Sequence, residues 1–65
     1  PLCRPMGQGL HEVRTRLANR IARVLFYVDR NRQMVLLHGF IKKTEATSAR
    51  ELDLALARKA EHEKG

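Results

Sequence analysis

The run from Ile21 to Val28 constrains the fold of this chain more than any other segment. Seven of its eight residues are apolar, and β-branched and aromatic side chains are frequent in it, a composition that favours a strand. Because successive side chains of a strand point to opposite faces, this strand is apolar on both faces except at Arg23. We therefore expect it to be a central strand, which needs cover on both faces.

The segments on either side of this run are also strand-like. Residues 10–17 alternate, with His11, Val13, Thr15 and Leu17 on one face and Glu12, Arg14 and Arg16 on the other. Residues 33–41 form a third β-prone run that ends in two lysines, and residues 18–20 and 29–32 are polar breaks that suit turns. The sequence predicts an antiparallel meander over residues 10–43.

The two ends of the chain have different patterns. Residues 1–9 hold both prolines and two of the four glycines, which predicts a loop. Gly7 and Gly9 precede a strand and lack the lysine of a phosphate-binding loop, so we expect a turn there. After Thr44, helix-forming residues dominate and no Gly or Pro occurs until Gly65.

This composition predicts a C-terminal helix over residues 47–63. Ser48 and Glu51 match a capping box, and Thr47 is an alternative N-cap. The helix should pack on the sheet through one stripe of small and apolar residues, namely Ala49, Leu52, Leu56 and Ala60, with Ala55 beside it. The expected fold is a single α+β domain over residues 1–65, with a meander of three or four strands followed by this helix.

One helix covers only one face of such a sheet. Either Val24 and Phe26 or their neighbours Leu25 and Tyr27 should then remain in water, which leaves a face available for self-association. A 65-residue chain with one cysteine also has a small core and no disulfide to support it. Because no initiator methionine precedes Pro1, we expect a fragment, a processed product or a truncated reading frame.

Charge is distributed unevenly along the chain. The whole chain has 13 basic and 7 acidic residues, but residues 1–43 hold nine basic residues against two acidic ones. Such an excess attracts polyanions, above all nucleic acid. No apolar stretch is long enough for a membrane span, and the basic N-terminus is not followed by the apolar run of a signal peptide. The single Cys3 suits a reducing compartment. We therefore expect a cytoplasmic protein that does not bind membranes.

Three stretches of this basic chain resemble the phage-derived Gp49-like, HigB-type branch of the RelE/ParE toxin superfamily. They are Arg4–Arg14, Ile21–Tyr27 and Leu36–Thr44, and the segment His-Gly-Phe-Ile-Lys-Lys-Thr from His38 is the most specific of them. The resemblance implies two N-terminal helices ahead of the segment present here, and these would cover the second face of the sheet.

The same resemblance implies the toxin of a type II toxin–antitoxin system. Such a toxin enters the ribosomal A site, cleaves mRNA as an endoribonuclease through the substrate's own 2′-hydroxyl, and is neutralised by a helix-turn-helix, HigA-like antitoxin. It implies no metal or organic cofactor. Two other functions stay open at this point: a non-catalytic module that binds RNA or the ribosome, and a ParE-like inhibitor of DNA gyrase.

Basic residues are the main candidates for a site. Arg14 and Arg16 project from one face of a strand, as a phosphate-binding pair requires. The alternative is that they form only the solvated face of an edge strand, where charge prevents aggregation. The RelE branch has lysines at these two positions, and Arg20 is a third candidate for binding phosphate. The resemblance places Arg23 among the catalytic residues, stabilising transition-state charge, together with Lys42 and Lys43.

Histidine and cysteine give weaker signals. His38 lies in an apolar strand and is a candidate general acid or base, although such a residue is more often structural. His11, His62 and Cys3 lack the spacing of metal ligands, so we expect no zinc site. The segment after Thr44 contains no aromatic residue that would stack on an RNA base, as the RelE branch has.

Overall fold

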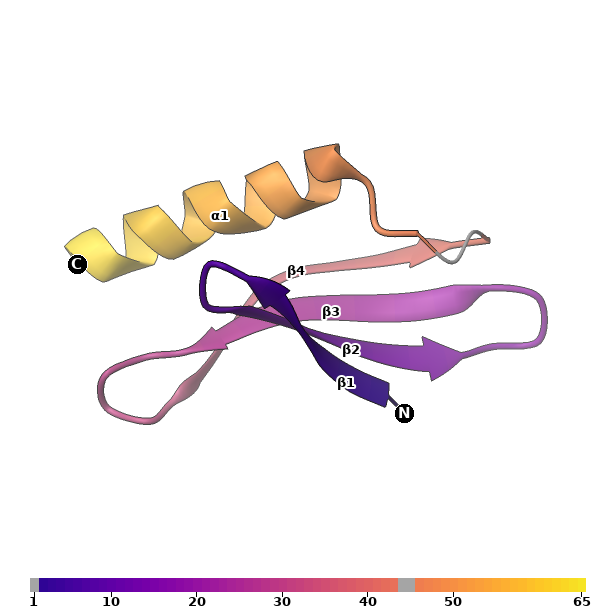
Figure 1. The fold of residues 1–65 in the computed structure, drawn as a ribbon, viewed down its shortest axis with the longest axis horizontal. Helices are drawn as coiled ribbons and strands as arrows, with labels where there is room; N and C mark the ends of the chain where they lie inside the picture. Colours follow the sequence, from indigo (N-terminus) through magenta and orange to yellow (C-terminus); the bar gives the residue numbers. More distant parts are fainter. Residues whose placement is uncertain (1, 44–45) are drawn as a thin grey trace.

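A computed structural model describes residues 2–43 and 46–65 of the chain. It has an α+β fold, in which a four-stranded antiparallel meander in the order β1-β2-β3-β4 precedes one helix (Figure 1). The strands are β1 (Leu2–Gly7), β2 (Leu10–Arg16), β3 (Ile21–Val28) and β4 (Met34–Lys42), and the helix is α1 (Ala49–Lys64). The predicted fold class is confirmed. Pro1 and Thr44, used in the sequence analysis, lie outside the described residues.

The first nine residues were predicted to be a loop, and this prediction is wrong. Leu2–Gly7 is the edge strand β1, which pairs antiparallel with β2. An edge strand tolerates Pro5 because one side of it has no neighbouring strand to bond with. Gly7, Gln8 and Gly9 all have positive φ angles (89°, 53° and 80°) and form the predicted turn, which glycine adopts without strain.

The two other hairpins lie where the polar breaks predicted them. In the β2–β3 hairpin the amide of Leu17 donates a hydrogen bond of 2.8 Å to the carbonyl of Arg20. In the β3–β4 hairpin, Oδ1 of Asp29 accepts from the amides of Asn31 and Gln33 at 2.8 and 2.9 Å, as a turn-forming Asp does. The central position of β3 is confirmed as well.

The N-terminus of α1 differs from the prediction. The helix begins two residues later than expected, with Ser48 as its N-cap, but the Ser48 side chain makes no capping hydrogen bond. Its Oγ instead accepts from Nζ of Lys42 at 3.1 Å, while the Glu51 carboxylate contacts His38. The predicted capping box is therefore wrong, because both of its side chains have partners on β4.

The helix packs on the sheet through the middle of the predicted stripe only. Ala55 is fully buried, and Leu52 and Leu56 pack against the core. Ala49 and Ala60 are exposed, so the stripe was predicted too long at both ends. The core between α1 and the sheet consists of five buried residues, which are Leu10, Leu25, Tyr27, Leu37 and Ala55.

A bulge in β4 helps to build this core. Leu25 pairs with His38 and Phe26 with Leu36, so Leu37 is an extra residue on β4. A bulge changes the alternation of side chains along a strand. Leu37 is buried in the core, and the side chain of its neighbour His38 also meets α1.

The opposite face of the sheet is apolar and more exposed. Large side chains on it are each more than half exposed, namely Val28, Met34, Leu36 and Ile41. Of the four residues expected to remain in water, Leu25, Phe26 and Tyr27 are buried and only Val24 is partly exposed. Phe26 is only 5% exposed, and its ring stacks on His11 with the ring centroids 5.4 Å apart.

No helix in the described part of the chain is long and apolar enough to cross a membrane.

Candidate nucleic-acid interface

Three of the predicted basic residues line one pocket where the β2–β3 hairpin meets the end of β4. Arg16, Arg20 and Lys43 surround a cavity of about 150 Å³ together with residues 17–19 and Ile21. The strand register brings them together, because Arg16 pairs with Ile21 and Ile21 pairs with Lys42. Three cations around one cavity can hold a phosphate group.

Lys42 and Lys43, adjacent in sequence, have different surroundings. Nζ of Lys42 donates to Ser48 and lies 5.6 Å from the centre of the Phe40 ring. Lys43 is exposed and lines the basic pocket. In this structure Lys42 therefore supports the start of α1, and Lys43 is the lysine available to an anion.

Arg14 and Arg23 share the face of the sheet that carries α1. They pair directly across β2 and β3, and like charges in that position repel each other. The Glu12 carboxylate offsets this repulsion, since its Oε1 accepts from Nε of Arg14 at 2.6 Å. The alternative that Arg14 belongs to a solvated edge strand is wrong, because β1 lies outside β2.

Arg23 is buried rather than placed at the rim of a site. It is only 1% exposed, and its guanidinium donates to Oγ1 of Thr47 at 2.6 Å. The Thr47 hydroxyl in turn donates to Oε2 of Glu12. The segment before α1 therefore covers Arg23, and the role of Arg23 in stabilising transition-state charge stays a prediction.

Glu12 is the acidic centre of this group and is fully buried. Burial by itself raises the pKa of its carboxyl group, but the hydrogen bonds from Thr47 and Arg14 and the charges of Arg14 and Arg23 lower it more. The net pKa lies below the ordinary value, so the side chain is ionised at neutral pH. A third arginine, Arg4, lies 3.5 Å from the same carboxylate, and its own side chain is 43% exposed.

His38 is a residue of β4 whose side chain contacts α1, and it does not line the basic pocket. Its Nε2 is 3.2 Å from Glu51 Oε2, and its Nδ1 is 3.4 Å from the guanidinium of Arg58. Arg58 also donates to the carbonyl of Leu37 at 2.8 Å. These contacts fit the tautomer with hydrogen on Nε2 and hold α1 against β4. A role for His38 as general acid or base stays a prediction, because both ring nitrogens have partners here.

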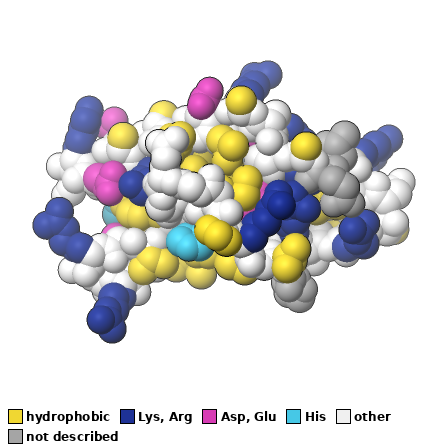
Figure 2. Space-filling view, in the orientation of Figure 1, with side chains coloured by type: hydrophobic (Ala, Val, Ile, Leu, Met, Phe, Trp, Pro, Cys, Tyr) yellow, Lys and Arg dark blue, Asp and Glu magenta, His cyan; other side chains and the backbone are white. Residues whose placement is uncertain are grey.

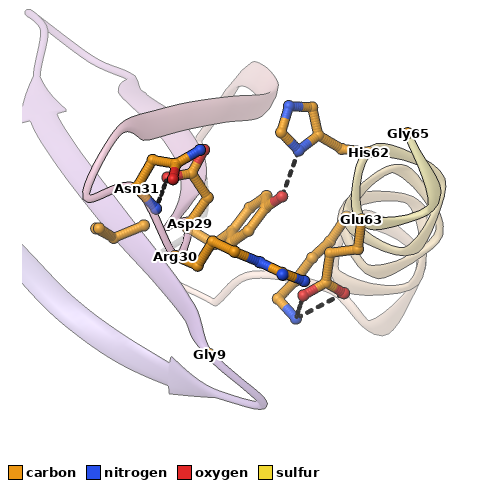
Figure 3. Close-up of a pocket in the computed structure, with 10 residues that line it drawn as sticks. Gly9, Asp29, Arg30, Asn31, His62, Glu63 and Gly65 are labelled. Atoms are coloured by element: carbon orange, nitrogen blue, oxygen red, sulfur yellow. Dashed lines mark hydrogen bonds and ion pairs between the residues drawn. The ribbon is translucent and has the colours of Figure 1, made fainter.

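A larger pocket lies between the β3–β4 hairpin and the C-terminus of α1 (Figure 3). These two elements lie at the opposite end of the molecule from the β2–β3 hairpin (Figure 1). Its volume is about 550 Å³. The Tyr27 hydroxyl is hydrogen-bonded to Nδ1 of His62, and Lys59 lies over the Tyr27 ring and bonds to Glu63 (Figure 3). Burial, followed by the charges of Glu63 and Asp29, raises the pKa of Tyr27. This tyrosine is therefore protonated at neutral pH and cannot act as a base.

Basic side chains are not confined to the pocket of Arg16, Arg20 and Lys43. Figure 2 shows Lys and Arg side chains around both ends of the molecule, as expected for a chain with a formal charge of +6. Within residues 2–43 and 46–65, no three His, Cys, Asp or Glu side chains are grouped so that they could hold a metal ion.

Sequence analysis missed the acidic and hydroxyl partners of the arginines. The alternation of β2 placed Glu12 on the same face as Arg14, and that was the available signal. It did not show that α1 and Thr47 would cover this face. Glu51 and Arg58 were likewise assigned to the helix without any link to His38.

Comparisons with known proteins give one match. A family model described as "Phage derived protein Gp49-like (DUF891)" matches residues 1–60. No curated protein matches the chain, and no solved structure does.

Proposed function

The chain belongs to the phage-derived Gp49-like family, and on this premise we propose that it is a HigB-type toxin that cleaves mRNA on the ribosome. Its partners would be mRNA, the ribosome and a helix-turn-helix antitoxin, all in the cytoplasm. The observation that best supports an RNA substrate is the convergence of Arg16, Arg20 and Lys43 on one pocket.

The chemistry of such cleavage suits these side chains. The 2′-hydroxyl of RNA attacks the adjacent phosphate, negative charge develops on the phosphate oxygens, and the 5′-oxygen leaves with a proton. Arginine and lysine stabilise the charge that develops. Because a guanidinium stays protonated at neutral pH, Arg16 and Arg20 bind the phosphate and do not remove the proton. We assign no residue as the general base.

A second candidate function is a module that binds RNA or the ribosome without cleaving it. Arg23 is buried, and both ring nitrogens of His38 have partners. These two observations favour binding over catalysis, since a catalytic group must reach the reacting atoms. Both functions use the same basic pocket, so they differ only in whether the RNA is cut.

Primer extension on a defined mRNA in a translation reaction separates the two functions. The wild-type chain should create new 5′ ends that require the ribosome, and Arg16→Ala or Lys43→Ala should each lower kcat/KM about tenfold, equivalent to ~1.4 kcal/mol. Arg30→Ala is the matched control, because Arg30 lies in the hairpin at the other end of the molecule and should leave cleavage unchanged.

The outcomes differ clearly. Ribosome binding without new 5′ ends would support the binding module and rule out the nuclease. If Arg16→Ala and Lys43→Ala had no more effect than Arg30→Ala, the pocket of Arg16, Arg20 and Lys43 would not be the RNA site. Loss of colony growth on expression, relieved by a co-expressed antitoxin, would test the toxin–antitoxin pairing independently.

A further inference from the structure

We propose that the basic pocket, lined by Arg16, Arg20 and Lys43, binds one sugar–phosphate unit of the RNA backbone. In this pocket Asn19 selects RNA over DNA by hydrogen bonding to the 2′-hydroxyl of the ribose. The proposal rests on the proposed function, because it takes RNA as the ligand of this pocket. It adds the part of the nucleotide that the pocket recognises and a residue that discriminates between the two nucleic acids.

The size of the cavity excludes a whole nucleotide. Its volume is about 150 Å³, whereas the pocket beside Tyr27 measures about 550 Å³. Pockets that enclose a drug-sized ligand, which a nucleotide resembles in size, usually have volumes of about 300–1,000 Å³. The basic pocket therefore has room for a phosphate group with part of its ribose, and the base stays outside.

The lining of the pocket also suits the backbone better than a base. The described residues around it are residues 16–21 and Lys43, and none of these has an aromatic ring. Bases of single-stranded nucleic acids commonly stack on aromatic side chains. With three cations and no such ring among the described residues, the pocket suits the charged backbone, which is the same in every sequence.

Asn19 is the only neutral polar side chain among the described residues that line the pocket. Arginine and lysine only donate hydrogen bonds, which suits phosphate oxygens because these accept. The asparagine amide both donates and accepts. On the RNA backbone the 2′-hydroxyl also does both, and DNA lacks this group. The amide therefore matches the group that distinguishes the two backbones.

The β2–β3 hairpin places Asn19 beside the cations. The hydrogen bond of 2.8 Å from the amide of Leu17 to the carbonyl of Arg20 closes the hairpin and leaves residues 18–19 at its tip. Asn19 is exposed, and its side-chain amide bonds to no other residue in the described part of the chain. Both its donor and its acceptor are therefore available to a ligand, next in sequence to Arg20.

The test measures binding of the chain to labelled single strands by fluorescence anisotropy. RNA and DNA strands of identical base sequence are compared, with uracil in both. The wild type should bind the RNA more tightly, and Asn19→Ala should reduce the ratio of the two affinities about fivefold, the effect of one neutral hydrogen bond. Other sources of RNA preference cancel in this double-mutant cycle. Asn19 has no positive φ angle, so alanine fits its backbone.

Asn31→Ala is the matched control. Asn31 lies in the β3–β4 hairpin, and its backbone amide, which alanine retains, donates to Asp29. This substitution should leave the ratio of the RNA and DNA affinities unchanged. Asn19→Gln keeps the amide on a longer side chain and should recover part of the ratio that Asn19→Ala loses.

An unchanged ratio in Asn19→Ala would overturn the proposal. A reduction that differs between adenine-rich and uracil-rich strands would also overturn it, because Asn19 would then contact the base. Equal binding of RNA and DNA by the wild type would do so without any variant.

Lys43→Ala distinguishes this failure from that of the proposed function. If Lys43→Ala weakens RNA binding while Asn19→Ala leaves the ratio unchanged, only the role of Asn19 fails. If Lys43→Ala has no effect, RNA binds elsewhere, and the proposed function loses its site together with this proposal.

Discussion

His38 on β4 and Glu51 on α1 form an ion pair or hydrogen bond of 3.2 Å that links the helix to the sheet. Both side chains are only 16% exposed, so water competes weakly for the contact. We predict that Glu51→Ala lowers the free energy of unfolding by about 1 kcal/mol, the typical value of such a bond. Urea unfolding measures this loss. Glu61→Ala, which removes an exposed carboxylate of the same helix, is the control and should change stability by less.

The same pair also tests the chemistry assigned to His38. If His38 is structural, His38→Gln should lower stability and leave kcat within about twofold of the wild type, since no proton transfer is lost. A loss of kcat of about 10²-fold or more in His38→Gln, with stability retained, would instead establish it as the general acid or base. Primer extension at several ribosome concentrations gives kcat separately from KM.

The lowered pKa of Glu12 predicts that the folded chain loses stability at acidic pH. Its folded-state pKa lies below the ordinary value of 4.5, so its ionised form stabilises the folded chain. This contribution is fully present above pH 4.5 and is lost as the pH falls through the lower folded-state value. Urea unfolding of the wild type and of Glu12→Gln between neutral and acidic pH should show that the variant lacks this part of the pH dependence. Parallel curves for the two proteins would contradict the prediction.

The raised pKa of Tyr27 predicts that the folded chain loses stability as the pH rises into the alkaline range. Burial, Glu63 and Asp29 raise its pKa above the ordinary value of 10.0, so the protonated form is favoured in the folded state. Its contribution to stability is complete below pH 10.0 and is lost as the pH rises through the folded-state value. Tyr27 is the only tyrosine and the chain has no tryptophan, so ultraviolet absorbance follows its ionisation directly. Ionisation at the ordinary value in the folded chain would show that the hydroxyl is not buried as described.

Much of this arrangement follows from the sequence, and the exceptions have physical causes. The sequence pattern identified β2 by its alternation, β3 and β4 by their apolar, β-prone composition, and α1 by its helix-forming residues. It missed β1, since Pro5 and the nearby glycines resemble a loop unless the strand lies at an edge. Arg16, Arg20 and Lys43 were chosen from charge and resemblance, but only the register of the meander brings them to one pocket.

The network around Glu12 was beyond prediction for a different reason. Its partner Thr47 is 35 residues away in the chain, and no local pattern links two such positions. A buried Glu is also rare enough that the default assignment for Glu12 was an exposed face. Only the placement of the segment before α1 over β2 and β3 reveals the contact.

Backbone conformation gives a prediction at the β1–β2 turn. Gly9 has a φ angle of +80°, which other residues adopt at a cost of about 1–2 kcal/mol. A Cβ at this position would also lie 3.4 Å from Cε of Lys59. We predict that Gly9→Ala lowers the free energy of unfolding by about that amount. Gly39→Ala is the control, since Gly39 has no positive φ and a Cβ there would make ordinary contacts at 3.8 and 3.9 Å.

Salt dependence tests whether the basic pocket binds phosphate. Each phosphate that a protein neutralises releases about one counterion, so log K for RNA binding falls linearly with the logarithm of salt concentration. Lys43→Ala should reduce the slope by about one and weaken binding to different RNA sequences nearly equally. Lys64→Ala removes an exposed lysine at the other end of α1 and is the control. Binding measured by fluorescence anisotropy at several salt concentrations gives both slopes, and equal slopes for wild type and Lys43→Ala would place the phosphate elsewhere.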